Sequence, residues 1–131
     1  MADQDQTTGT AEAVNDGVLT LKLTGTDYRL ALVLEGEPPS AGSRTTGTIH
    51  ARARRVDVVP AGGRYIEPVA GRPRRVQGRI IGGDPAKNTI TVKAATAVVC
   101  TLTDSRQKTT QFATGQLVSF DVEPGATFTL A

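Results

Sequence analysis

The sequence predicts an all-β protein, built as a single compact barrel of about nine strands, with a β-sandwich as the alternative. Three observations favour this class. Apolar residues do not recur at helical spacing, short alternating apolar and polar runs are frequent, and segments rich in Gly and Pro separate these runs. The chain has 131 residues, which is enough for one domain with a single core.

The first two expected strands cover residues 17–24 and 27–35. In the first, Leu19, Leu21 and Leu23 alternate with polar residues, and Gly25-Thr26 then suits a two-residue hairpin turn. The second strand places four large residues on its inner face, namely Tyr28, Leu30, Leu32 and Leu34. Its other face carries Ala31 and Val33, so this strand is either covered on both sides or meets a partner.

The middle of the chain is predicted as a long loop, two strands and the turns between them. Residues 36–47 form the loop, because Pro38 and Pro39 cannot lie in a central strand. The strands are expected in segments 48–59 and 69–81, with a short RYIEP segment between them. The composition of residues 82–88, GGDPAKN, is typical of a turn.

The last part of the chain reads as a hairpin, a polar loop and two closing strands. The segments NTITVKA and AVVCTLT form the hairpin, and residues 103–115 form the loop. In the strand that follows, Val118, Phe120 and Val122 alternate and are expected to face inward. Pro124-Gly125 then turns the chain into the strand ATFTL.

Residues 74–130 resemble the OB-fold, a five-stranded Greek-key barrel. The resemblance lies in the order of a long strand with RVQGRII, the hairpin, the polar connection, the strand entered through FATGQLV, and a closing strand. The connection TDSRQKTTQF could form one helical turn at the place where an OB-fold usually has a helix. The resemblance implies that one barrel face binds oligonucleotides or oligosaccharides.

Residues 1–14 are predicted to be a flexible polar arm, and residues 15–131 a single barrel domain. The arm is low in hydrophobicity and rich in polar residues. It lacks the basic and apolar regions of a secretory signal, and no apolar run of the chain approaches the roughly 20 residues that span a bilayer. We therefore expect a cytoplasmic protein that does not contact a membrane.

Charge is distributed unevenly along the chain. Residues 1–43 carry seven acidic and two basic residues, a net charge of −5, whereas residues 44–79 carry nine Arg and two acidic residues, a net charge of +7. Such asymmetry indicates contact with an anionic partner or with the acidic part of another copy. The alternative is that these arginines only keep a β surface soluble.

The segment HARARR provides the candidate binding row. On an extended strand, His50, Arg52 and Arg54 lie on one face and span about 13 to 14 Å, which suits the phosphates of a stretched nucleic-acid strand. If residues 69–81 pair alongside this strand, their arginines extend the row. The full predicted site comprises ten residues: His50, Arg52, Arg54, Arg55, Arg64, Tyr65, Arg72, Arg74, Arg75 and Arg79.

These residues predict a non-enzymatic module that binds an anionic partner, best matched by single-stranded nucleic acid with little sequence preference. Tyr65 is the one good candidate for stacking on a base, so binding should be weak and strongly salt-dependent. The alternative is a homo-oligomeric structural subunit, in which the acidic arm of one copy meets the basic face of another.

Catalytic and cofactor chemistry find little support in the sequence. There is one His, no Trp and no phosphate-binding loop, so no catalytic site, cofactor or metal site is predicted. Cys100 lies in the apolar run AVVCTL and is expected to be a core residue.

Two pairs of short segments resemble each other within the chain. LTLKL from residue 19 resembles ITVKA from residue 90, and GTIHA from residue 47 resembles GQLVS from residue 115. The second alignment sets His50 and Arg52 against Val118 and Phe120 and thus exchanges a polar face for an apolar one. From sequence alone, an old duplication and a coincidence are both compatible with these matches.

Overall fold

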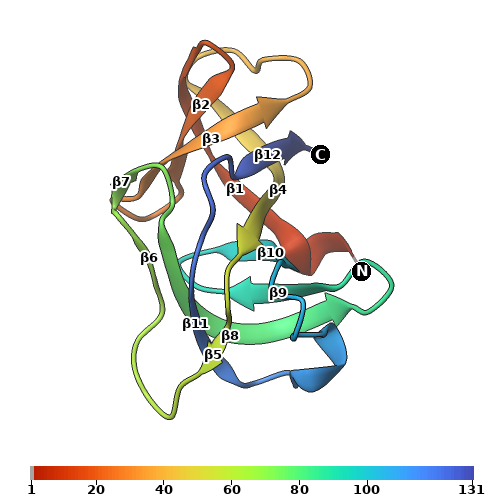
Figure 1. Cartoon of the computed structure of the whole chain (residues 1–131). Helices are drawn as coiled ribbons and strands as arrows, with labels where there is room; N and C mark the ends of the chain where they lie inside the picture. Colours follow the sequence, from red (N-terminus) through yellow and green to blue (C-terminus); the bar gives the residue numbers. More distant parts are fainter. Residues whose placement is uncertain (1) are drawn as a thin grey trace.

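The computed structural model describes residues 2–131 and is an all-β barrel structure, as the sequence predicts (Figure 1). Its strands form two barrels, however, and not the expected single barrel of about nine strands. One sheet of twelve strands contains almost all of the regular structure. In chain order the elements are η1 (Ala2–Asp5), β1 (Gln6–Asn15), β2 (Val18–Leu23), β3 (Arg29–Glu35), β4 (Ser43–Ala53), β5 (Asp57–Val58), β6 (Tyr65–Glu67), β7 (Ala70–Gly71), β8 (Arg75–Asp84), β9 (Thr89–Lys93), β10 (Ala97–Leu102), η2 (Thr109–Gln111), β11 (Leu117–Asp121) and β12 (Thr127–Leu130).

The first barrel is a closed ring of five strands in the order β1–β2–β3–β12–β4, with β4 returning to β1. The β3–β12 pair is parallel and the other pairs are antiparallel. Closure gives each strand of this ring two hydrogen-bonded neighbours and so reduces the strand edge that is open to another chain.

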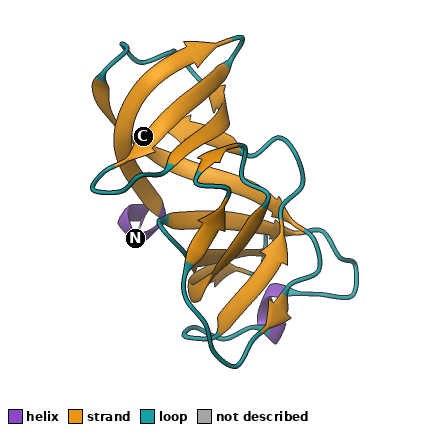
Figure 2. Cartoon of the chain, turned by 90° about the vertical axis from the view of Figure 1, so that its left-hand side faces the viewer, coloured by secondary structure: helices purple, strands orange, loops and turns teal. Residues whose placement is uncertain are grey.

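The second barrel is formed by β8, β9, β10, β11 and the last part of β4. Here β10 pairs with β4 in parallel, and β8 pairs with both β9 and β11. The ring is completed where Ala53 of β4 bridges to Val122, just after β11. Figure 2 shows the two barrels one above the other, with η1 near their junction and η2 at the far end of the second barrel.

The two barrels are built alike. Strands β1 and β8 have ten residues each, and each has a bulge opposite its partner strand at the same place, between Ala11 and Ala13 and between Ile80 and Gly82. The fourth residue of each strand is a glycine. A Cβ on Gly9 would overlap the carbonyl oxygen of Lys22, and one on Gly78 that of Lys93.

This likeness supports the first of the two segment matches and corrects the second. LTLKL lies in β2 and ITVKA in β9, which are equivalent second strands of the two barrels. GTIHA and GQLVS also lie in equivalent strands, but the pairings align Thr48 with Asp121 and not with Gln116. The repeat is therefore present in the fold. The match between GTIHA and GQLVS differs from the structural alignment of the same strands by five residues.

The barrels exchange their fifth strands. Residues 43–48 of β4 pair with β1 in the first barrel, and residues 49–53 of the same strand pair with β10 in the second. In return, the chain leaves β11 of the second barrel and enters β12 of the first (Figure 1). Each barrel is thus closed by the strand that follows the fourth strand of the other.

This exchange corrects the extent of the OB-like region. Strands β8 to β11 follow the order expected for residues 74–130, but the strand that closes their barrel is β4. The expected closing strand, β12, lies in the first barrel, where Phe128 is fully buried.

The prediction of a flexible arm at residues 1–14 is wrong, because residues 6–15 form β1. Thr7, Gly9 and Ala11 alternate as buried residues inside the first barrel, and Thr7 shares a 2.7 Å hydrogen bond with Thr96 of the second. Glycine fits at position 9 of this strand because β2 approaches it closely there, through the Lys22 carbonyl and the Leu21 side chain. The acidic residue Glu12 is therefore held on a barrel strand and not on a free arm.

The apolar side chains of both barrels form one continuous core. The expected inward residues Leu19, Leu21 and Leu23 are buried in the first barrel, and Val118 and Phe120 in the second. Cys100 is also fully buried, and this burial raises the pKa of its thiol well above the ordinary value. The thiol is a core group, as predicted.

Candidate nucleic-acid interface

Strand β4 presents the predicted basic row on its outer face. Ala51 and Ala53 are buried, whereas His50, Arg52 and Arg54 are exposed, as the two-residue period requires. At Ile49 and His50, β4 lies between β10 and β12, and His50 is opposite Val99 and Thr127. The row therefore starts where the two barrels join and runs toward the second barrel.

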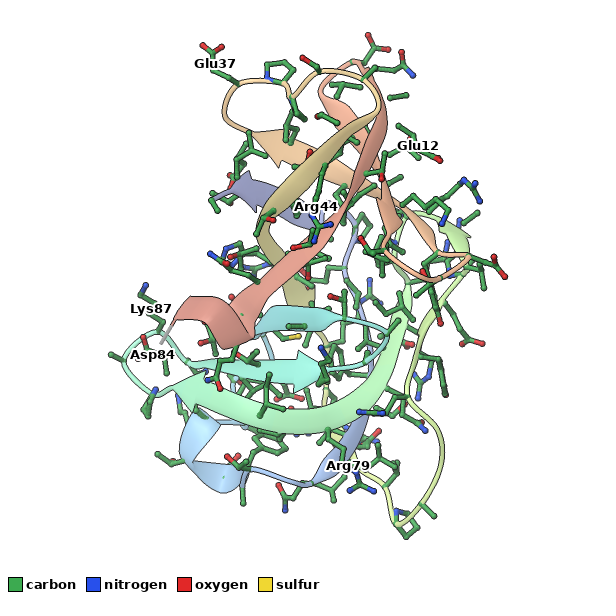
Figure 3. The ribbon with its side chains drawn as sticks, turned by 180° about the vertical axis from the view of Figure 1, so that it is seen from behind. Glu12, Glu37, Arg44, Arg79, Asp84 and Lys87 are labelled. Carbon is green, nitrogen blue, oxygen red and sulfur yellow. The ribbon has the colours of Figure 1, made fainter. Side chains whose placement is uncertain are left out.

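A hollow of about 410 Å³ lies beside the start of this row. It covers the outer faces of β9 and β10, and the β8–β9 turn and η1 form its border. Its lining is polar, with His50, Lys87, Gln4, two carboxylates and four threonines; the residues are Gln4, Asp5, Thr48, His50, Gly83, Asp84, Lys87, Thr89, Thr91, Val99 and Thr101. Figure 3 shows Asp84 and Lys87 on the turn at its rim.

The row is partly neutralised by one acidic residue, which lies in the segment after β11 of the same chain. Arg52 donates from Nε to the Glu123 carboxylate at 3.0 Å. Arg54 follows the end of β4, and its backbone N–H donates to the carbonyl oxygen of Asp121 at 2.9 Å. Among the ion pairs of residues 4–131, none involves the Arg54 side chain, so its guanidinium is open to an external anion.

Arg75 is tied into the second barrel and does not extend the row as an open charge. Its guanidinium donates to Asp121 at 2.7 Å and to the hydroxyl of buried Ser119 at 2.8 Å. The hydrogen bond to Asp121 raises the pKa of Arg75 above its ordinary value, so the charge is fixed in place.

The prediction that residues 69–81 lie beside β4 is wrong. Strand β8 is separated from β4 by β9 and β10 on one side and by β11 on the other. Arg79 donates to the Gly115 carbonyl at 2.8 Å, away from the row (Figure 3). Arg72 lies on the first barrel, beside Val18 and Val33, and Arg74 borders a separate hollow with Glu67 and Val69.

The other predicted site residues belong to the loops and the short strand β6 around the second barrel. Arg55 pairs with Asp57 at 3.1 Å, and Arg64 is exposed on the loop before β6. Tyr65 donates its hydroxyl to Gln77 at 3.1 Å, and Gln77 in turn donates to the Gly63 carbonyl at 2.9 Å. Tyr65 therefore holds this loop against β8 instead of standing open for a base.

The structure thus retains a smaller site than the sequence predicts. His50, Arg52 and Arg54 are together, and the hollow adds Lys87 and hydroxyl groups that sequence reasoning did not include. The alternation in TITVK was the available signal, because it places Thr89 and Thr91 on the face opposite the buried Ile90 and Val92.

Comparison of the chain with protein-family models, curated proteins and solved structures gives no match. In residues 2–131, no helix is both long and apolar enough to cross a bilayer.

Proposed function

We propose that the chain is a non-enzymatic binding module that holds single-stranded nucleic acid across β4 and the adjoining hollow, with little sequence preference. The observation that carries this proposal is that the basic row begins at the edge of the hollow. A backbone running along His50, Arg52 and Arg54 would bring its next sugar or base over the threonine hydroxyls of β9 and β10. Strands β9 and β10 are the second and third strands of their barrel, and in OB-folds the face of these two strands binds the ligand.

The charges around the site set the expected strength of binding. Arg54 offers an open guanidinium, whereas Arg52 must share its charge with Glu123. Asp5 and Asp84 line the hollow and repel phosphate, so phosphates should follow the row while neutral sugar and base atoms occupy the hollow. We expect dissociation constants of about 10 to 100 µM near physiological salt, as for sequence-independent binders.

Fluorescence anisotropy with a labelled oligonucleotide of about 12 nucleotides tests this proposal at about 50 and 200 mM salt. The double variant Arg52→Ala with Arg54→Ala should weaken binding about tenfold at low salt and reduce the salt slope by about 1 to 2 units.

The matched control is Arg64→Ala with Arg79→Ala, which removes the same charge from exposed positions on and beside β8, away from the row. The affinity of this variant for the oligonucleotide should stay within about twofold of that of the parent protein, because sequence-independent binding depends on local phosphate contacts. Equal weakening by the two double variants would show that net charge, and not this row, determines binding.

A further inference from the structure

The outer face of the first barrel carries an exposed apolar pair at its centre. Val18 of β2 and Val33 of β3 are cross-strand neighbours, with 37% and 42% of their surfaces exposed. Beside them lies a shallow hollow of about 190 Å³, lined by Val18, Ala31, Val33, Arg72, Gly125 and Ala126. Large apolar side chains that touch each other in the open indicate a contact surface more strongly than isolated ones do.

The two ends of this face carry opposite charges. Lys22 and Arg29 are paired at one end, four residues from the valines along each strand, which corresponds to about 13 Å. Exposed Glu35 lies at the other end, two residues beyond Val33, and Asp16 lies in the turn just before Val18. Along its length the face therefore changes from a basic end, which Glu12 partly neutralises, through the two valines with Arg72 beside them, to an acidic end.

We propose that a second copy of this chain packs on this face, around a twofold axis that passes near Val18 and Val33. A surface with an apolar centre and opposite charges at its ends is its own complement after a half turn. In such an isologous contact the Lys22 end of one copy meets the Glu35 end of the other, twice. The valines of both copies then cover one another.

Existing contacts leave the charged ends available for this interface. Arg29 pairs with Glu12 at 2.9 Å, but 47% of its side chain remains exposed. Lys22 donates to the Thr26 carbonyl at 2.7 Å and has two further ammonium protons to offer. Because both charged contacts lie at the rim, salt should weaken the dimer.

This interface is independent of the proposed nucleic-acid site, which lies on the other barrel. The dimer can therefore fail while oligonucleotide binding persists, or the reverse, and the two experiments remain distinguishable. Oligonucleotide affinity per chain should not change when the dimer is disrupted.

Sedimentation velocity from about 5 to 200 µM protein tests the apolar centre. The parent chain should pass from monomer to dimer in this range, and Val33→Lys should raise the dissociation constant at least about a hundredfold. Val58→Lys is the matched control, because Val58 is also an exposed valine, at 53%, but lies on β5 of the second barrel. A parent chain that stays monomeric at 200 µM, or a dimer that Val33→Lys leaves unchanged, would overturn the proposal.

Charge reversal tests the twofold arrangement itself. Lys22→Glu and Glu35→Lys should each weaken self-association about tenfold or more, because each places like charges together at both ends. Mixing the two variants should restore a dimer, since both ends then pair opposite charges. Failure of the mixture to associate more tightly than either variant alone would rule out this arrangement, and matching thermal unfolding would show that both variants fold.

Discussion

The outer faces of the two barrels have the same backbone and opposite chemistry. The strand pairings place Val18 and Val33 of the first barrel where the second has Thr89 and Thr101. The buried positions between them keep their apolar character, with Leu21 aligned to Val92. The repeated barrel therefore sets where each outer face lies, while a few outward side chains decide whether that face is apolar or polar.

The reaction rate of the Cys100 thiol tests whether the two barrels unfold as one unit, and we expect it to show the largest effect. It is fully buried in the second barrel, and burial raises its thiol pKa, so a thiol reagent should reach it only after unfolding. We expect native Cys100 to react at least about a thousandfold more slowly than in denaturant, with a free energy of opening equal to that of global unfolding. Faster reaction would show that the second barrel opens alone.

The equivalent glycines provide a direct test of the likeness between the barrels. Gly9→Ala and Gly78→Ala should each lower the free energy of unfolding by about 2 to 3 kcal/mol, because the new methyl group would overlap a backbone carbonyl that cannot turn aside. Denaturant unfolding measures both values. Gly63→Ala is the control, since nothing lies within 4 Å of its added Cβ, and should change stability by less than about 0.5 kcal/mol. A large difference between the two barrel glycines would contradict their equivalence.

Exchanging the outward residues gives the smallest effect on stability and the sharpest test of the comparison. Val18→Thr with Val33→Thr gives the first face the hydroxyls that the second carries at these positions. We expect less than about 0.5 kcal/mol change in the free energy of unfolding, because the residues are exposed, and about tenfold weaker self-association. Thermal unfolding and sedimentation measure the two effects. An unaltered self-association would mean that these valines are not part of a contact.

Local pattern accounts for the strands that the sequence predicts correctly. Alternation identifies the inward residues of β2 and β11, and the outward position of His50, Arg52 and Arg54. It missed β1 because its inward residues are Thr, Gly and Ala, which are not read as a hydrophobic face. The predicted two-residue turn at Gly25 is instead a four-residue loop closed by a hydrogen bond between Leu23 and Tyr28.

The exchange of strands could not be read from local pattern, because it depends on which distant strands meet. Placing β8 beside β4 followed the tendency of successive long strands to pair, but here β4 is already flanked by β1, β10 and β12. Arg72, Arg74 and Arg79 were assigned to the row for the same reason. The hollow escaped prediction because its hydroxyl groups come from three strands, none of which stands out alone.

The exchange of strands also determines the order in which the two barrels can be completed during translation. Thr129 of β12 donates a hydrogen bond to Glu35, which precedes it by 94 residues. At about 5 to 20 residues per second, the strands made first must therefore wait about 5 to 20 s for the strand that closes their ring. The second barrel is encoded later, but its closing strand β4 is synthesised before its other strands. During translation the second barrel should therefore be completed before the first.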